Sequence, residues 1–181
     1  ADFGIFMWGN LNGSWSQNVM GYSENSDISW GDYKQRGWEE SKLISYMESH
    51  DEERIIYKAL TFGSENGSYS TKELPTALER LEAAQVLYLS SPGPKMIWQF
   101  GELGYDISID ENGRTGRKPV KWDYLDDPNR SHVASTVATI NGLRKNYKDL
   151  NSLNYNLEGS GLAKNLTIDG EDIDFVVLTN F

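Results

Sequence analysis

His50 and Asp51 stand side by side where an apolar segment, Leu43–Glu48, gives way to polar sequence. An imidazole and a carboxylate can bind the hydroxyl groups of a ligand, and a carboxylate can also stabilise positive charge. We predict that the apolar segment is a buried strand, so the pair would lie where that strand leaves the core. The alternatives for His50 are a strand cap or a hydrogen-bonded core histidine. Glu52 and Glu53 fit the solvated first turn of a helix, where acids are favoured.

The composition restricts the chemistry available to these residues. The chain has 181 residues and a formal net charge of −10, which argues against a nucleic-acid partner, because such binding depends on Lys and Arg. Its six Trp and ten Tyr suit neutral ligands such as sugars. It has no cysteine, which excludes disulfides, thiolate metal sites and cysteine nucleophiles. No apolar run approaches the roughly 18 residues of a membrane-spanning helix.

Three apolar segments are predicted to be buried strands: Phe3–Asn10, Leu43–Glu48 and Lys95–Phe100. A long polar loop with short helical pieces is expected between the first two strands. Ser70 and Glu73 have the spacing of a capping box, which predicts a helix reaching about Leu89.

Asp127 followed by a proline predicts the start of another helix. After Leu150 the character changes, and the segments Leu166–Ile168 and Ile173–Leu178 alternate as antiparallel strands do. We therefore predict two domains, residues 1–150 and the beginning of an all-β domain at residues 151–181.

Repeated strand–helix units indicate a parallel sheet, in which ligands bind at the carboxyl ends of the strands. The residues predicted at those ends are Trp8, His50, Asp51, Gln99 and Glu102. Three units cannot close a barrel, so they fit part of a doubly wound sheet or the last part of an eight-fold barrel. Metal binding is not expected in this segment, since the chain has only two histidines and the acidic stretch "DISIDENG" lacks EF-hand spacing.

Three motifs resemble the α-amylase superfamily, glycoside hydrolase family 13. "MESHDEER" is similar to its last conserved catalytic motif, which closes the seventh barrel strand. "PGPKMIWQFGELG" is similar to the eighth strand, and "KPVKWDY" with the D-P-x-R helix start resembles the final helix region. The resemblance implies a fold class of α/β type, a partial (β/α)8 (TIM) barrel containing strands 6–8 with their helices, followed by an antiparallel β segment.

The resemblance also implies roles for the strand-end residues. Asp51 would be the catalytic transition-state stabiliser and His50 would contact the same sugar. Gln99, Glu102 and Trp8 would be substrate-binding walls of the pocket. The implied activity is hydrolysis of α-1,4-glucosidic bonds in an α-glucan or oligosaccharide. The alternatives are a glucan-branching transferase of the same superfamily, which also carries an S-H-D-E run, and a non-catalytic glucan-binding protein.

The family's nucleophile and acid/base lie on its fourth and fifth strands, which would precede residue 1. The chain opens on "ADFGIFMWGN" and closes on "FVVLTNF", and both ends look cut. We therefore expect a piece of a longer enzyme that is inactive alone. Calcium, where the parent binds it, would be held mostly by upstream residues. We expect a bacterial, exported protein, and the unpaired edge of the first strand could be covered by a second copy of the chain.

Overall fold

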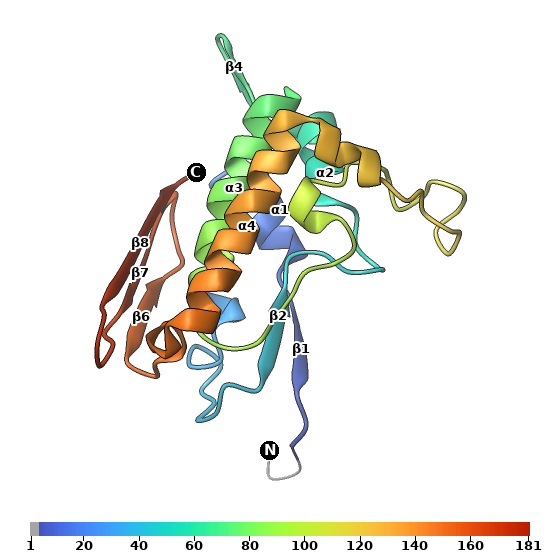
Figure 1. Cartoon of the computed structure of the whole chain (residues 1–181). Coiled ribbons are helices and arrows are strands. Elements are labelled where there is room, and N and C mark those ends of the chain that lie inside the picture. Colours follow the sequence, from blue (N-terminus) through green and yellow to red (C-terminus); the bar gives the residue numbers. More distant parts are fainter. Residues whose placement is uncertain (1–3) are drawn as a thin grey trace.

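The computed structural model describes residues 4–181, and it consists of three β–α units followed by an antiparallel sheet (Figure 1). Short 3-10 helices occur at Ser29–Gly31, Gly101–Leu103, Trp122–Asp126 and Lys148–Asn151. The strands are β1 (Met7–Asn10), β2 (Leu43–Tyr46), β3 (Glu65–Asn66), β4 (Tyr69–Ser70), β5 (Lys95–Met96), β6 (Tyr155–Glu158), β7 (Ala163–Ile168) and β8 (Phe175–Asn180). The helices are α1 (Asn12–Met20), α2 (Ile55–Phe62), α3 (Leu74–Ser90) and α4 (Pro128–Asn146).

The parallel sheet has the strand order β1-β2-β5. Its register places Asn10 beside Tyr46 and Tyr46 beside Met96. These three residues therefore lie side by side across the sheet. The carboxyl ends of all three strands lie at the same end of the sheet. The predicted parallel sheet is confirmed, and residues 47–54 and 97–120 are brought to one end of it.

All three predicted buried strands are shorter than expected, and the second ends at Tyr46 instead of Glu48. Only Met7–Asn10 of the first pairs as a strand, Phe3 lies outside the described residues, and Trp8 is 57 % exposed. The prediction that this strand is buried is wrong because, among residues 4–181, β1 pairs with β2 alone and forms an edge. The third strand ends at Met96, since the backbone then leaves the sheet and Phe100 adopts a left-handed φ of 58°.

One of the two helix starts predicted from capping residues is confirmed and the other is wrong. Asp127 caps α4 as predicted, accepting hydrogen bonds from the backbone N–H groups of Asn129 and Arg130. The capping box predicted at Ser70 is wrong, because α3 begins four residues later and Glu73 makes no side-chain cap. The nine-residue helix α1 occupies part of the segment expected to be mainly loop.

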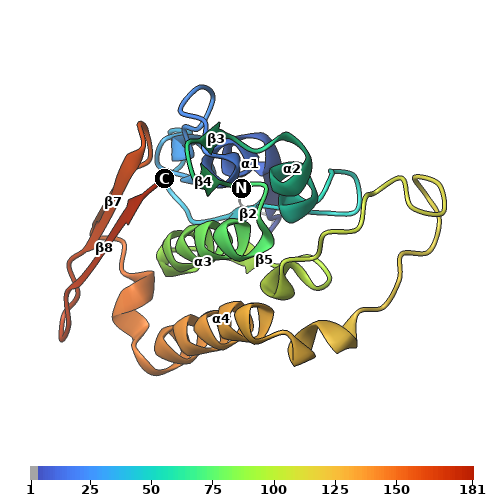
Figure 2. The ribbon, with the colours of Figure 1, turned by 90° about the horizontal axis from the view of Figure 1, so that it is seen from above.

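The helices pack in layers beside the sheet, with α3 between α4 and the first two units (Figure 2). The antiparallel sheet β6-β7-β8 packs against α3 through β8. One apolar core includes Trp15 of α1, Leu81 of α3 and Leu166 of β7, and the ring of Phe181 lies 6.4 Å from that of Trp15. Residues 151–181 thus share a core with the helices, while the predicted division into two domains stays a prediction.

Candidate functional site

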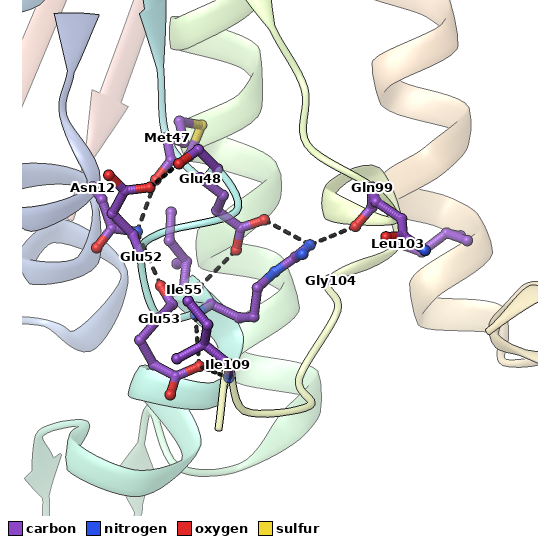
Figure 3. Close-up of polar contacts among 12 residues, drawn as sticks. Asn12, Met47, Glu48, Glu52, Glu53, Ile55, Gln99, Leu103, Gly104 and Ile109 are labelled. Carbon is purple, nitrogen blue, oxygen red and sulfur yellow. Dashed lines mark hydrogen bonds and ion pairs between the residues drawn. The ribbon is translucent and has the colours of Figure 1, made fainter. Parts of the chain in front are cut away.

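A buried ion pair shapes the turn that follows β2. Arg54 Nη2 lies 2.9 Å from Glu48 Oε2, and both side chains are buried. Glu48 Oε1 accepts the backbone N–H of Ile55, the first residue of α2, and Arg54 donates to the carbonyl of Gln99 at 2.6 Å (Figure 3). The pair therefore connects the end of β2, the start of α2 and the segment after β5.

The close approach of Gly101 belongs to the same arrangement. A Cβ atom added to Gly101 would lie 2.9 Å from Glu48 Oε2. This is shorter than an ordinary contact, so the absence of a side chain at this position leaves room for the buried carboxylate.

His50 and Asp51 project from the turn between Glu48 and Arg54. Their side chains are 65 % and 69 % exposed, and His50 Nε2 lies 3.3 Å from Asp51 Oδ2. The His50 ring lies 5.9 Å from that of Trp98. The alternative of a core histidine is therefore wrong, and both groups are free to meet a ligand.

Glu52 and Glu53 do not form a solvated helical turn, because α2 begins only at Ile55. Glu52 accepts hydrogen bonds from Asn10 of β1, at 2.5 Å, and from the hydroxyl of Ser49. It therefore joins the ends of two neighbouring strands. Burial and the nearby Glu52 carboxylate both raise the pKa of Tyr46 above its usual value, in that order of size.

Glu53 connects the turn to the polar segment that follows β5. Its carboxylate accepts the Ser108 hydroxyl at 2.8 Å. It also accepts the Ile109 N–H at 2.8 Å (Figure 3). The carbonyl of Glu53 accepts from Asn12 Nδ2 at 3.0 Å. Arg114 Nη2 donates to the carbonyl of Asp51 at 2.5 Å, so the polar segment is joined to the turn at two points.

The turn and the polar segment enclose a pocket of about 570 Å³. This volume lies in the usual range for small-molecule sites. Burial raises the pKa of Tyr105 on its wall. The pocket is lined by Ser49, His50, Asp51, Glu52, Arg54, Trp98, Gln99, Tyr105, Ile107, Ile109, Arg114, Thr115, Gly116, Arg117, Lys118 and Val120.

The predicted site residues fall into two groups. His50, Asp51 and Gln99 line the same pocket. Glu102 and the exposed Trp122 instead line an adjoining hollow, which shares Gln99 with the first pocket. Trp8 packs edge-on against Tyr46 with ring centres 5.4 Å apart. Neither Glu102 nor Trp8 lines the pocket that contains Asp51, and the roles of all five residues stay predictions.

Sequence reasoning missed Arg54, Glu53 and Arg114 as parts of this site. Arg54 follows a run of three acids, which could have suggested a partner for one of them. The contacts of Glu53 with Ser108 and Ile109 span more than fifty residues, and only the three-dimensional fold brings them together.

Within residues 4–181, no group of three His, Cys, Asp or Glu side chains is arranged to hold a metal ion. None of the helices described here combines the length and apolar character needed to cross a membrane.

No protein-family model matches the sequence, and no curated protein sequence matches it either. Solved structures do match its fold. AmyP in complex with maltose gives a TM-score of 0.63 at 12 % identity, covering 93 % of this chain and 38 % of that one. The chain is structurally similar to α-amylase-family enzymes over most of its length.

Two further matches carry the same fold. The cyclic α-maltosyl-(1→6)-maltose hydrolase from Arthrobacter globiformis, solved with that sugar, gives a TM-score of 0.61 at 15 % identity, covering 95 % of this chain and 37 % of that one. The type III pullulan hydrolase from Thermococcus kodakarensis gives 0.59 at 18 % identity, covering 92 % and 28 %. The chain therefore spans about a third of the length of these enzymes.

Proposed function

We propose that this chain is part of an α-amylase-type retaining glycosidase that acts on α-glucans. The observation that carries the proposal is the position of His50 and Asp51. Both are exposed, both line a pocket of about 570 Å³, and both follow a strand at the carboxyl edge of the parallel sheet. Ligands bind at this edge in parallel α/β folds, and the matched structures include enzymes solved with maltose or a cyclic maltosyl sugar.

In this proposal Asp51 accepts hydrogen bonds from ring hydroxyls of the sugar whose bond is cleaved. Such bonds strengthen as the ring distorts and gains positive charge, and they contribute several kcal/mol in the transition state. His50 lies 3.3 Å from Asp51 and contacts the same sugar, while Trp98 offers an aromatic face beside it. Gln99 is the third predicted residue on the pocket wall.

The reaction needs two more carboxylates, a nucleophile and an acid/base about 5–5.5 Å apart. Glu52 is the other acid on this pocket wall, and its oxygens already accept from Asn10 and Ser49. We therefore propose that both catalytic carboxylates belong to a longer protein that contains this chain as strands 6–8 of a (β/α)8 barrel. Calcium, where the longer protein binds it, would be held mostly by residues that precede this chain.

A product assay on the longer protein tests the proposal. Incubation with maltooligosaccharides or starch should release new reducing ends in proportion to the bonds broken. A glucan-branching transferase would leave the number of reducing ends nearly constant while forming branches. A non-catalytic glucan-binding protein would bind the sugar without either change. The isolated 181-residue chain should release no reducing sugar.

The open edge of β1 supports the view that more strands join this sheet. Ile5, Phe6 and Met7 beside this edge are each about half exposed, and an unpaired strand edge readily binds another strand. We propose that the rest of the longer protein covers this edge, and that a second copy covers it when residues 4–181 are produced alone. Sedimentation of both forms distinguishes the two arrangements. Export from a bacterial cell is also proposed, and cell fractionation tests it.

A further inference from the structure

One wall of the pocket is basic although the whole chain is acidic. Arg114, Arg117 and Lys118 all line the pocket that contains His50 and Asp51. The formal net charge of the chain is −10, so three cations within five residues run against the overall balance.

These cations are not neutralised by carboxylates. Arg114 donates to the carbonyl of Asp51, and Lys118 Nζ donates to the carbonyls of Glu111, Gly113 and Arg114 at 2.7, 2.8 and 3.5 Å. Across residues 4–181, none of the three forms an ion pair with an acidic side chain. Arg54 on the same pocket differs, because Glu48 pairs with it at 2.9 Å.

The basic wall is also held in place at both ends. Glu53 accepts from Ser108 and Ile109 before it, and the Tyr105 hydroxyl donates to the Pro119 carbonyl after it, at 2.7 Å. A tethered segment presents its charges at a defined position, which reduces the entropy cost of binding a ligand.

The charges lining the pocket leave an excess of one positive. Arg54 is left out of this count because it is already paired. The other cations that line the pocket are Arg114, Arg117 and Lys118, and the carboxylates are Asp51 and Glu52. Since Glu52 already accepts from Asn10 and Ser49, a bound anion would supply the negative charge that the basic wall lacks.

We propose that the pocket takes an α-glucan whose sugar carries an anionic substituent, a phosphate, sulfate or carboxylate, bound by Arg117 with the positive charge of Lys118 beside it. The inference rests on the proposed function and narrows its substrate class. A guanidinium binds such groups through two parallel hydrogen bonds, and an ammonium adds a point charge. The volume of about 570 Å³ leaves room for both a sugar ring and its substituent.

Calorimetric titration of the longer protein at low salt tests this inference. The probes are glucose, glucose 6-phosphate, glucose 6-sulfate, glucuronate and inorganic phosphate. At least one charged sugar should bind about tenfold or more tightly than both glucose and inorganic phosphate, and raising the ionic strength should weaken that binding. Comparison of the three charged sugars identifies which anion the wall prefers.

Variants assign the binding to the basic wall. Arg117→Gln and the double variant Arg117→Gln/Lys118→Gln should remove most of the preference for the charged sugar. Arg117→Lys/Lys118→Arg keeps both charges and should retain it. The unfolding temperature of each variant shows that the fold is intact, and Arg117→Gln alone serves where replacing Lys118 disturbs the segment.

Several results would overturn the inference. Glucose binding as tightly as all three charged sugars would show that the wall does not select an anion. Inorganic phosphate binding as tightly as glucose 6-phosphate would indicate a bare anion site without sugar recognition. If the longer protein hydrolyses unsubstituted maltooligosaccharides but shows no preference for charged sugars, this inference alone is wrong. If it binds charged sugars but hydrolyses no glucan, the proposed function alone is wrong.

Discussion

Glu48 and Arg54 form an ion pair that brackets the exposed His50–Asp51 turn, with Arg54 Nη2 2.9 Å from Glu48 Oε2. Both side chains of the pair are buried, while those of His50 and Asp51 are about two-thirds exposed. The two groups proposed to meet the sugar are thus presented by a turn whose two ends are held together inside the protein.

Replacing one partner of this pair should be strongly destabilising. Arg54→Met leaves the Glu48 carboxylate buried without its cation, which typically costs about 3–5 kcal/mol. The double variant Glu48→Gln/Arg54→Met removes the stranded charge and should recover part of that loss. Urea unfolding of both variants measures the difference. Arg117→Met, on the exposed pocket wall, is the control and should change stability by less than about 0.5 kcal/mol. A double variant no more stable than Arg54→Met would contradict the argument.

Asp51→Asn should remove catalysis from the longer protein while leaving its fold intact. Losing about 4 kcal/mol of transition-state stabilisation corresponds to roughly a thousandfold fall in kcat. Reducing-end release measures the rate, and circular dichroism checks the fold. Asp110→Asn, an exposed acid in the segment after β5, is the matched control and should retain its rate. An unchanged kcat for Asp51→Asn would mean that this carboxylate is not part of the reaction.

Glu53→Gln should loosen the segment that carries the basic wall. The carboxylate accepts from Arg54 N, Ser108 Oγ and Ile109 N, and an amide offers only one oxygen for these donors. A hydrogen bond to a charged group contributes about 1.5–3 kcal/mol, so amide exchange of Ile109 should accelerate by about tenfold or more. Glu111→Gln, on the same segment but exposed, should leave this exchange rate unchanged. Equal rates in both variants would show that Glu53 does not anchor the segment.

Lys95 predicts a pH dependence of stability. Burial, and then the nearby Arg144, lower the pKa of Lys95 to about 7, whereas an unfolded lysine titrates near 10.4. Between these values the unfolded state binds more protons, so the contribution of Lys95 to stability rises with pH from about 7 to about 10. Below pH 7 Lys95 is protonated in both the folded and the unfolded state, so the full free-energy cost of burying its charge lowers the stability.

Lys95→Met should therefore stabilise the protein most at pH 6 and progressively less toward pH 10. Denaturant unfolding of both proteins at several pH values measures the difference. If the difference in unfolding free energy between the two proteins stays constant from pH 6 to pH 10, the pKa of Lys95 is not lowered in the folded state.

The parallel sheet and the residues that follow the carboxyl end of β2 can be predicted from the sequence. The carboxyl end of Leu43–Glu48 does carry His50 and Asp51 to a pocket, and Asp127 does cap α4, because both depend on local pattern. The exposed Trp8 could not be predicted in the same way, since an apolar run has the same letters at an edge as in the middle of a sheet.

Polar contacts with distant or competing partners do not follow from local sequence pattern. Helix α1 buries the polar residue Asn12, whose side chain donates to the carbonyls of Met47 and Glu53. The helix therefore lacks the continuous apolar stripe by which an amphipathic helix is predicted from sequence. The S-x-x-E spacing predicts a cap at Ser70, but the Ser70 hydroxyl accepts from Lys72 N in a turn before α3 begins. In both cases distant or competing partners decide the outcome.

Gly101 shows how a distant charge can restrict one position of the chain. Its backbone lies outside the left-handed region, so its own conformation would tolerate other residues. The restriction comes instead from Glu48 Oε2, which a Cβ atom would approach to 2.9 Å. In a saturation library selected for folded protein, residue 101 should therefore stay glycine in the native background and accept alanine once Glu48 is shortened to aspartate, so the two positions would vary together.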